Sequence, residues 1–189
     1  MYRVLACILF TSLFALPAEA ALSVGAKAPG FTAQASLGGK EFTFALDDAL
    51  KNGPVVLYFY PKAFTGGCTV EAHLFAEATD KFKALGATVI GVSHDDIATL
   101  NRFAMLECRN KFAVAADTDQ HIMKAYDAVL AQKPEYANRT SYVIVPDGTV
   151  LYTYTDLDPT HHVENTMAAL QKWAAEHKPK EQKTLKPRI

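Results

Sequence analysis

Two short apolar runs with an amphipathic stretch between them constrain the fold of this chain more than any other feature. Residues 54–60 (PVVLYFY) and 87–93 (ATVIGVS) each have the length of a strand and almost no polar side chains. Strands with this composition are covered on both faces, as in the sheets of α/β proteins. Between the runs, apolar residues recur at helical spacing: Phe75, Ala78, Phe82 and Leu85. The pattern predicts a strand, a helix over about 68–85 and a second strand.

The rest of the chain continues this alternation. Helices are expected over about 97–109, 120–127 and 160–176, and strands over 112–115, 141–145 and 149–155, with a short alternating run at 40–44. Pro146-Asp147-Gly148 supplies a turn between the last two strands, which makes them a hairpin. The order strand, helix, strand, helix, strand, hairpin and helix predicts an α/β sandwich, in which a central mixed β-sheet is flanked by helices.

The composition supports one globular domain and excludes several classes of function. With 189 residues, the chain is long enough for one domain with a sizeable core and too short for two comfortable ones. Lys and Arg total 19 against 20 Asp and Glu, so the basic excess typical of nucleic-acid-binding proteins is missing. The three cysteines are too few for a disulfide-dense scaffold, and the sequence has no CxxC pair for a zinc or thioredoxin-type redox site. We therefore expect no nucleic-acid partner and no bound metal or other cofactor.

The first twenty residues have the pattern of a secretory signal. Arg3 precedes an apolar run over 4–16, and Ala18-Glu19-Ala20 provides the small residues that signal peptidase requires. The apolar run is too short to cross a bilayer core of about 30 Å as a helix. We predict cleavage after Ala20, export to the periplasm and no stable membrane insertion afterwards. The alternative is an uncleaved membrane anchor.

The mature chain then consists of a folded domain and a basic tail. We assign the domain to 21–177 and the tail to 178–189, which holds five Lys or Arg residues, two prolines and little apolar surface. This composition predicts a solvated, disordered segment, and binding to an anionic surface is the alternative. Removal of residues 1–20 leaves Cys68 and Cys108 as the cysteines of the mature protein, in an oxidising compartment.

Cys68 stands at a position that favours chemistry. It follows 61–67 (PKAFTGG), a loop between the first predicted strand and its helix. In the first turn of a helix, unpaired backbone N–H groups and the positive end of the dipole stabilise a thiolate relative to a thiol. Gly66 and Gly67 let the backbone bend close to whatever binds at the sulfur, and Thr65 brings a hydroxyl to the same region. The alternative interpretation is a buried small hydrophobe, the usual role of a free cysteine.

Pro61, Thr65 and Cys68 form the pattern PxxxTxxC, which resembles the active-site loop of the peroxiredoxins. The continuation 69–72 (TVEA) is similar to their Q-type, or bacterioferritin-comigratory, branch. Further matches follow in the order of that family: 25–31 (GAKAPGF), 92–95 (VSHD), 111–112 (KF) with Asp117, 139–144 (RTSYVI) and 146–148 (PDG). Gly30 departs from the pattern, because an Asp is more usual there. The resemblance covers about 24–173 and implies a thioredoxin-like fold.

The resemblance also implies an activity and roles for individual residues. The chain would be a thiol-dependent peroxidase for hydrogen peroxide and small organic hydroperoxides, with Cys68 as the peroxidatic cysteine that becomes a sulfenic acid. Thr65 would hydrogen-bond the thiolate and the peroxide, Arg139 would place a positive charge beside both, and Pro61 would shield the site from solvent. From the residues alone, the alternative for Arg139 is a surface ion pair.

Stabilising the thiolate does not by itself make an efficient peroxidase. A site that increases the thiolate fraction also makes the sulfur a weaker nucleophile, and the two effects largely cancel. The site must therefore stabilise the negative charge that builds on the departing oxygen in the transition state. We expect Thr65 and Arg139 to act mainly on the rate of sulfur oxidation.

The sulfenic acid then needs a second thiol. Q-type members often carry a resolving cysteine five residues after the peroxidatic one, where this chain has His73. Others place it in the helix after the second strand, and Cys108, near the end of that predicted helix, resembles their pattern. Cys108 is therefore expected to form an intramolecular disulfide with Cys68; the alternative is a core thiol, with resolution by an external thiol. The reductant would be a thioredoxin-like protein in the same compartment, and the enzyme a monomer or weak dimer.

Two other functions are compatible with parts of the sequence. A thioredoxin-fold binding or holdase protein would keep Cys68 and Cys108 as a static structural disulfide. A thiol–disulfide oxidoreductase of cytochrome maturation would need the CxxC motif that is missing. His161 and His162 suggest a metal site, but adjacent histidines on a helix diverge by about 100° and do not readily chelate one ion.

Overall fold

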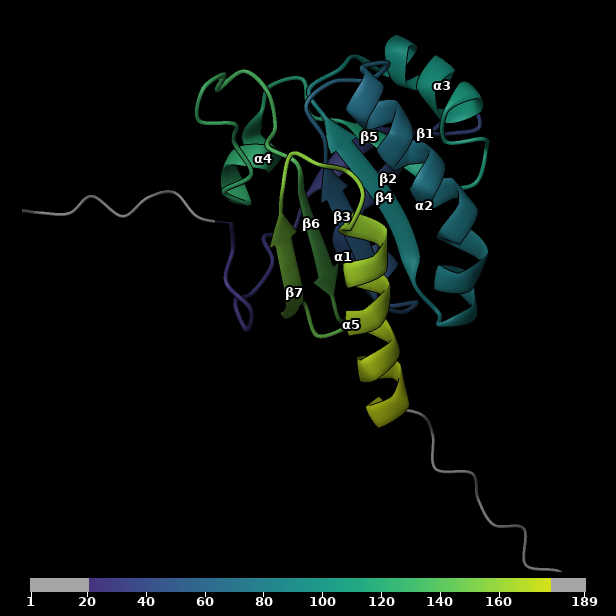
Figure 1. Cartoon of the computed structure of the whole chain (residues 1–189), viewed down its shortest axis with the longest axis vertical. Helices are drawn as coiled ribbons and strands as arrows, with labels where there is room; N and C mark the ends of the chain where they lie inside the picture. The colour runs from purple at the N-terminus through teal and green to yellow at the C-terminus, as the bar shows by residue number, and fades with distance from the viewer. Residues whose placement is uncertain (1–20, 178–189) are drawn as a thin grey trace, which may run out of the picture.

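The computed structural model describes residues 21–177, and the predictions for 1–20 and 178–189 lie outside this range. The elements are β1 (Thr32–Leu37), β2 (Lys40–Ala45), α1 (Leu46–Leu50), β3 (Val55–Phe59), α2 (Gly66–Ala84), β4 (Thr88–Ser93), α3 (Ile97–Leu106), β5 (Ala113–Ala116), α4 (His121–Ala125), β6 (Thr140–Ile144), β7 (Val150–Thr155) and α5 (His162–His177). They confirm the predicted α/β sandwich with a mixed central sheet (Figure 1).

The seven-stranded sheet has its parallel strands at the centre. The strand order is β2-β1-β5-β4-β3-β6-β7, in which β3, β4 and β5 run parallel and the outer strands pair antiparallel. The two apolar runs of the sequence supply β3 and β4, which pair along their whole length. Because the carboxyl ends of parallel strands lie at one edge of a sheet, the loops after β3 and β4 meet there. The loop after β3 leads directly into Cys68.

Helices cover both faces of this sheet, and β3 divides its side chains between two cores. Val56 and Tyr58 face the cluster formed with α2, α3 and α5, whereas Leu57 and Phe59 face the cluster formed with α1 and α4. Figure 1 shows α2 and α5 side by side on one face of the sheet. Gly91 of β4 leaves room for the ring of Tyr58, since a Cβ at that position would lie 2.7 Å from Cζ of the ring. Burial on both faces explains why β3 lacks polar residues.

The third helix ends earlier than its apolar pattern predicts. α3 stops at Leu106 rather than near 109, because Arg109 (φ 52°) and Asn110 (φ 58°) adopt left-handed backbone conformations. The amide of Cys108 bonds back to the carbonyl oxygen of Phe103 at 3.0 Å. Cys108 therefore lies in the turn after α3 and not within the helix.

β1 and α1 have no counterpart among the predicted elements. β1 (TAQASL) consists of small and polar residues with little apolar contrast, and its pairing with β2 and β5 defines it as a strand. α1 has five residues, and its buried leucines, Leu46 and Leu50, pack on the sheet. A helix of this length is too short to show a helical period in the sequence.

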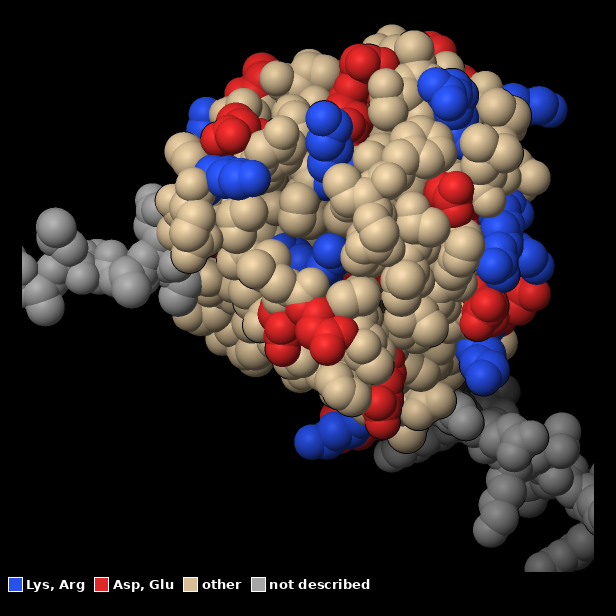
Figure 2. All heavy atoms as spheres, turned by 45° about the horizontal axis from the view of Figure 1, so that its top comes forward, with Lys and Arg blue, Asp and Glu red and all other residues tan. Residues whose placement is uncertain are grey.

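The surface of the described residues carries charges of both signs. Figure 2 shows basic and acidic side chains interspersed over one face, without a broad region of a single sign. Within 21–177, no helix combines the length and the apolar composition that crossing a membrane requires.

Candidate active site

Cys68 is the third residue of α2, at the amino-terminal end of the helix. Its side chain is 1% exposed, although much of the loop before it is open to solvent. Thr65 is the N-cap residue and has an extended backbone (φ −83°, ψ 151°). The N–H groups of the first helical turn lack partners within the helix, and together with the helix dipole they favour negative charge at the sulfur.

Arg139 brings a positive charge to the sulfur. It immediately precedes β6, the strand next to β3. Its Nη2 lies 3.5 Å from Cys68 Sγ, while its Nε donates to the carbonyl oxygen of Leu157 at 2.9 Å. A Cβ at Gly67 would lie 3.0 Å from the same Nη2, so glycine leaves the guanidinium room beside the start of the helix. The structure thus brings Cys68 and Arg139 together, and the buried Arg139 does not form the surface ion pair considered as its alternative role.

Glu71, which the sequence motif does not single out, contacts the other terminal nitrogen of the Arg139 guanidinium. It lies one helical turn after Cys68, is completely buried, and accepts a hydrogen bond from Arg139 Nη1 through Oε2. Burial raises the pKa of the Glu71 carboxyl to about 8, although Arg139 opposes this shift. A signal for Glu71 exists in the sequence, because a carboxylate beside apolar Ala72 and Phe75 on one helix needs a buried partner.

The loop before Cys68 is fixed by Asp95, which follows the neighbouring strand β4. The Asp95 carboxylate accepts from the amide of Ala63 at 2.7 Å and from the hydroxyl of Ser93 at 2.8 Å. Phe64, in the same loop, has a left-handed backbone (φ 63°), which is a strained conformation for a bulky residue. Its ring rests edge-on against Phe103 at 5.2 Å. The loop is therefore pinned at Ala63 and strained at Phe64, close to the start of α2.

Thr65 and Pro61 lie in this loop, as the motif requires. The hydroxyl of Thr65 donates to the carbonyl oxygen of Lys62 at 3.0 Å. Pro61 is half-buried at the beginning of the loop. The hydrogen bonds of Thr65 to thiolate and peroxide stay a prediction, as does the shielding role of Pro61.

Cys108 belongs to the same apolar cluster as Cys68. It is completely buried, and burial together with the neighbouring Glu107 raises the pKa of its thiol well above the ordinary range. Tyr58 and Tyr60, at the end of β3, lie near both cysteines, and burial raises the pKa of each tyrosine. Both cysteines are free thiols in this structure, so the disulfide between them stays a prediction.

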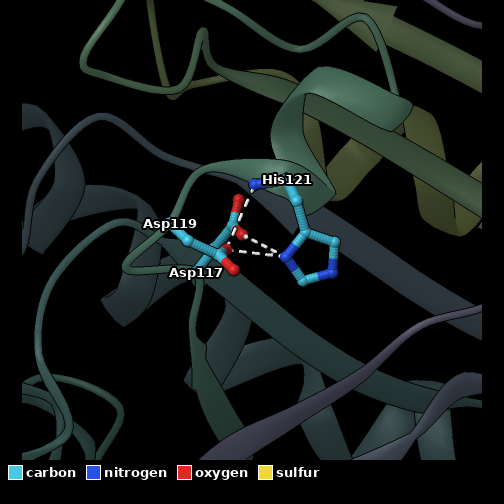
Figure 3. Close-up of side chains that lie close together, drawn as sticks. All are labelled: Asp117, Asp119 and His121. Atoms are coloured by element: carbon cyan, nitrogen blue, oxygen red, sulfur yellow. Dashed lines mark hydrogen bonds and ion pairs between the residues drawn. The ribbon is translucent and has the colours of Figure 1, made fainter.

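A second group of ionisable side chains lies at the start of α4. Figure 3 shows Asp117, Asp119 and His121 close together. The Asp117 carboxylate accepts from the amides of Ile122 and Met123 at 3.0 and 2.8 Å, so that it caps α4. Asp119 pairs with Nδ1 of His121 at 2.6 Å. Helix capping and this exposed pair account for the arrangement of the group.

A buried thiol at the start of a helix, beside a buried arginine on a sheet with this topology, is the arrangement of a thiol-dependent peroxidase with a thioredoxin-like fold. The chain belongs to the AhpC/TSA family, whose profile matches residues 24–153. It is a peroxiredoxin, a peroxidase of the oxidoreductase class.

Individual relatives place it near the Q-type and Bcp-type peroxiredoxins. The chloroplastic peroxiredoxin Q of Oryza sativa subsp. japonica is 32% identical over 151 residues, which is 79% of this chain and 67% of the relative. The putative peroxiredoxin YkuU of Bacillus subtilis (strain 168) is 34% identical over 157 residues, 78% of this chain and 87% of the relative. The crystal structure of peroxidoxin BcpB from Mycobacterium tuberculosis has a TM-score of 0.72 at 27% identity, covering 79% of this chain and 96% of that one. These similarities confirm the predicted fold and enzyme class.

Proposed function

We propose that Cys68 reduces hydrogen peroxide and small organic hydroperoxides as a thiolate nucleophile. The sulfur attacks one peroxide oxygen, so that an S–O bond forms while the O–O bond breaks. The sulfur is oxidised by two electrons to a sulfenic acid. The second oxygen leaves as hydroxide or alkoxide, takes up a proton and departs as water or an alcohol.

The contact between Arg139 and Cys68 carries this proposal. Nη2 of Arg139 lies 3.5 Å from the sulfur, where negative charge passes from sulfur to the departing oxygen. Because Arg139 is also held by Glu71 and by the carbonyl of Leu157, its charge is in place before the reaction begins. A preorganised donor of this kind contributes about 10²–10³-fold in rate. Thr65 becomes a second donor when its hydroxyl turns from the Lys62 carbonyl toward the peroxide.

Cys108 resolves the sulfenic acid in this proposal. Its thiol displaces the sulfenic oxygen, so that a Cys68–Cys108 disulfide forms and water leaves. A disulfide requires Cα atoms within about 7 Å, and we expect the first turn of α2 to unwind to allow this. The strained backbone at Phe64 borders that turn. A dithiol protein of the thioredoxin type then returns two electrons to the disulfide.

The site of action that we propose is the periplasm. Support comes from the pattern of residues 1–20, which lie outside the described range. Amino-terminal sequencing and intact mass of the protein from a periplasmic fraction test this, and we expect the chain to begin at Ala21. A chain that keeps Met1 and is recovered from the cytoplasm would contradict export.

Stopped-flow oxidation of the reduced protein by hydrogen peroxide tests the activity, with Cys68→Ser and Cys108→Ala alongside. We expect fast oxidation that disappears in Cys68→Ser, and a sulfenic acid that dimedone traps at Cys68 in Cys108→Ala. A reaction no faster than that of free cysteine would overturn the proposal and favour the binding protein with a static disulfide. Unchanged turnover of Cys108→Ala with a dithiol reductant would remove Cys108 from the mechanism and leave Cys68 in it.

A further inference from the structure

A buried polar cluster continues from Arg139 beyond its contact with Cys68. Its members come from α2, from β6 and the residue before it, and from the first turn of α5: Glu71, Arg139, Ser141 and His162. None of the four is more than 4% exposed. The proposed mechanism uses Arg139 and gives His162 no role, yet a buried imidazole in such a cluster affects the charge of its neighbours.

Hydrogen bonds fix both the ring of His162 and its tautomer. Nε2 lies 2.9 Å from the carbonyl oxygen of Asp156, which only accepts, so Nε2 carries the proton of the neutral ring. Nδ1 is then an acceptor, and the hydroxyl of Ser141 donates to it across 2.8 Å. Burial lowers the pKa of His162 to about 4, which keeps the ring neutral near pH 7.

The free oxygen of Glu71 faces this acceptor nitrogen. Oε2 of Glu71 is occupied by Arg139, whereas Oε1 is buried without a hydrogen-bond partner among the described residues. Oε1 lies 3.7 Å from Nδ1 of His162. When Glu71 is a carboxylate and His162 is neutral, Oε1 faces a nitrogen that has no proton to donate and whose one lone pair accepts from Ser141. A proton on Oε1 removes the unpaired buried charge, and Nδ1 accepts this proton in a hydrogen bond when the Ser141 hydroxyl turns away.

The charge of the cluster explains why this proton matters at Cys68. With Glu71 ionised, Arg139 faces two buried negative charges, the thiolate and the carboxylate. With one proton on Glu71 or His162, the thiolate and the guanidinium balance. An unbalanced buried charge is costly, and a guanidinium shared with a carboxylate gives less stabilisation to the departing oxygen.

We propose that His162 is a positioning residue for peroxide reduction: together with Glu71 it holds one proton behind Arg139, so that the guanidinium directs its charge to Cys68. The proposal rests on the proposed role of Cys68. The proton exchanges with solvent and is not consumed. Other ionisable groups near the pair, from each element packed on it, are Tyr58 of β3, Cys68 of α2, Tyr154 of β7, Asp156 and Asp158 of the following loop, and His161 and Glu164 of the α5 region.

The test is the pH profile of sulfenic acid formation, measured by stopped flow in a Cys108→Ala background. We expect a bell-shaped profile that rises as the Cys68 thiolate forms and falls as the pair loses its proton. In His162→Asn, the amide turns its NH₂ group to Oε1 and stabilises the carboxylate, so the falling limb moves down by about one pH unit or more. In Glu71→Gln, which is neutral at every pH, the falling limb disappears.

His161→Asn is the matched control, because His161 is exposed and pairs only with Glu164 among the described residues, at 3.4 Å. The pH profile of His161→Asn should match that of the parent.

The outcomes separate this inference from the activity itself. A fast reaction whose profile is unchanged in His162→Asn and Glu71→Gln would overturn the role of His162 and leave the peroxidase intact. A parent protein that reacts no faster than a free thiol would overturn both. If His162→Asn does not fold, ¹⁵N shifts of His162 in the parent decide: a ring neutral and Nε2-protonated down to about pH 5 supports the proposal. A ring that protonates like free imidazole near pH 6.5 contradicts it.

Discussion

The two cysteines of the described chain lie in one apolar cluster, yet they have opposite electrostatic surroundings. Cys68 stands at a helix amino terminus with Arg139 Nη2 3.5 Å from its sulfur. Cys108 lies in a turn next to Glu107, and burial and Glu107 both raise the pKa of its thiol. Neither side chain is more than 1% exposed. Burial alone keeps a thiol inert, and in the proposed function the fixed positive charge of Arg139 makes the equally buried thiol of Cys68 a nucleophile.

The largest effect should follow from removing that charge. We expect Arg139→Met to lower the second-order rate constant of Cys68 oxidation by about 10²–10³-fold, because it removes a preorganised donor from the departing oxygen. Arg139→Lys should recover part of the rate, since lysine keeps the charge but cannot bond Glu71, Leu157 and the sulfur together. Stopped-flow oxidation by hydrogen peroxide measures both variants.

Arg102→Met is the matched control for Arg139. Arg102 is an exposed arginine of α3 whose guanidinium carbon lies 5.5 Å from the centroid of the Phe64 ring. Phe64 belongs to the loop that precedes Cys68. If catalysis requires a positive charge in contact with the sulfur, and not merely near the loop, Arg102→Met should change the rate of Cys68 oxidation less than about twofold. Equal losses in the two variants would refute the electrostatic difference between Cys68 and Cys108, and so would an Arg139→Met enzyme that oxidises at the parent rate.

The second effect concerns stability, for which Cys108 is expected to be the more sensitive of the two cysteines. We expect Cys108→Ser to lower the free energy of unfolding by about 1–3 kcal/mol, because the hydroxyl enters an apolar cluster. Cys68→Ser should cost less than about 1 kcal/mol, since Arg139 can donate to the new oxygen. Urea unfolding of the reduced proteins measures the difference. A larger loss for Cys68→Ser would mean that the polar and apolar surroundings are assigned to the wrong cysteines.

The polar surroundings of Cys68 should also make stability depend on pH. The Glu71 pKa is raised from 4.5 to about 8, so its contribution is complete below 4.5 and is lost as pH rises through about 8. The His162 pKa is lowered from 6.5 to about 4, so its contribution is present above 6.5 and is lost as pH falls through about 4. The two trends oppose each other between 4.5 and 6.5. From pH 6.5 to 8 only the Glu71 loss remains, and the free energy of unfolding should fall by about 1–2 kcal/mol.

Glu71→Gln isolates this contribution. The variant cannot ionise at position 71, so the decline between pH 6.5 and 8 should shrink by that amount in urea unfolding, while other titrating groups affect both proteins alike. A variant whose stability declines with pH as steeply as that of the parent would show that the Glu71 carboxyl is not held protonated by its burial.

The sequence predicts most of this fold because its strongest signals are local. The apolar runs of β3 and β4 and the helical period of α2 depend on neighbours within about ten residues, and their boundaries agree with the structure within two residues. The sequence does not predict α1, because five residues are too few to show a helical period. It does not predict β1, because that strand is too weakly apolar to show an alternating pattern. The end of α3 is misplaced because Arg109 and Asn110 take up left-handed conformations without the glycine that normally signals them.

The candidate site is predicted only in part, for the same reason. Cys68 and Arg139 follow from a motif and from a resemblance along the chain. Three further residues contribute to the site through partners more than thirty residues away in the sequence: Glu71, Asp95 and His162. Contacts at such separations leave no periodic pattern in the sequence. A buried carboxylate in a helix is a signal that a partner must exist, but it does not say which residue that partner is.

The smallest expected effect concerns the rate of disulfide formation, for which the buried Cys108 thiol must leave its position in the apolar cluster. Three side-chain pairs connect α2 to the segment that carries Cys108: the hydrogen-bonded pair His73–Glu107 at 2.7 Å, and the ion pairs Glu77–Arg109 at 3.2 Å and Asp80–Lys111 at 3.1 Å. The first is half-buried and lies next to Cys108, whereas the other two are largely exposed and individually weak. Together they hold the segment in the position where the Cys108 thiol is buried and inert.

Glu107→Gln should therefore speed disulfide formation by about two- to fivefold without changing the oxidation of Cys68, because it breaks one pair and removes a negative charge beside the Cys108 thiol. Arg109→Gln is the control, because it breaks the pair with Glu77 and leaves the charge of Glu107 in place. Faster disulfide formation in both variants would assign the effect to the side-chain pairs. Faster disulfide formation in Glu107→Gln alone would assign it to the charge of Glu107. Added salt should accelerate the parent enzyme and affect the variants less. If neither substitution nor salt changes the rate of the second step, the side-chain pairs do not control the release of Cys108, and the motion of α2 alone limits it.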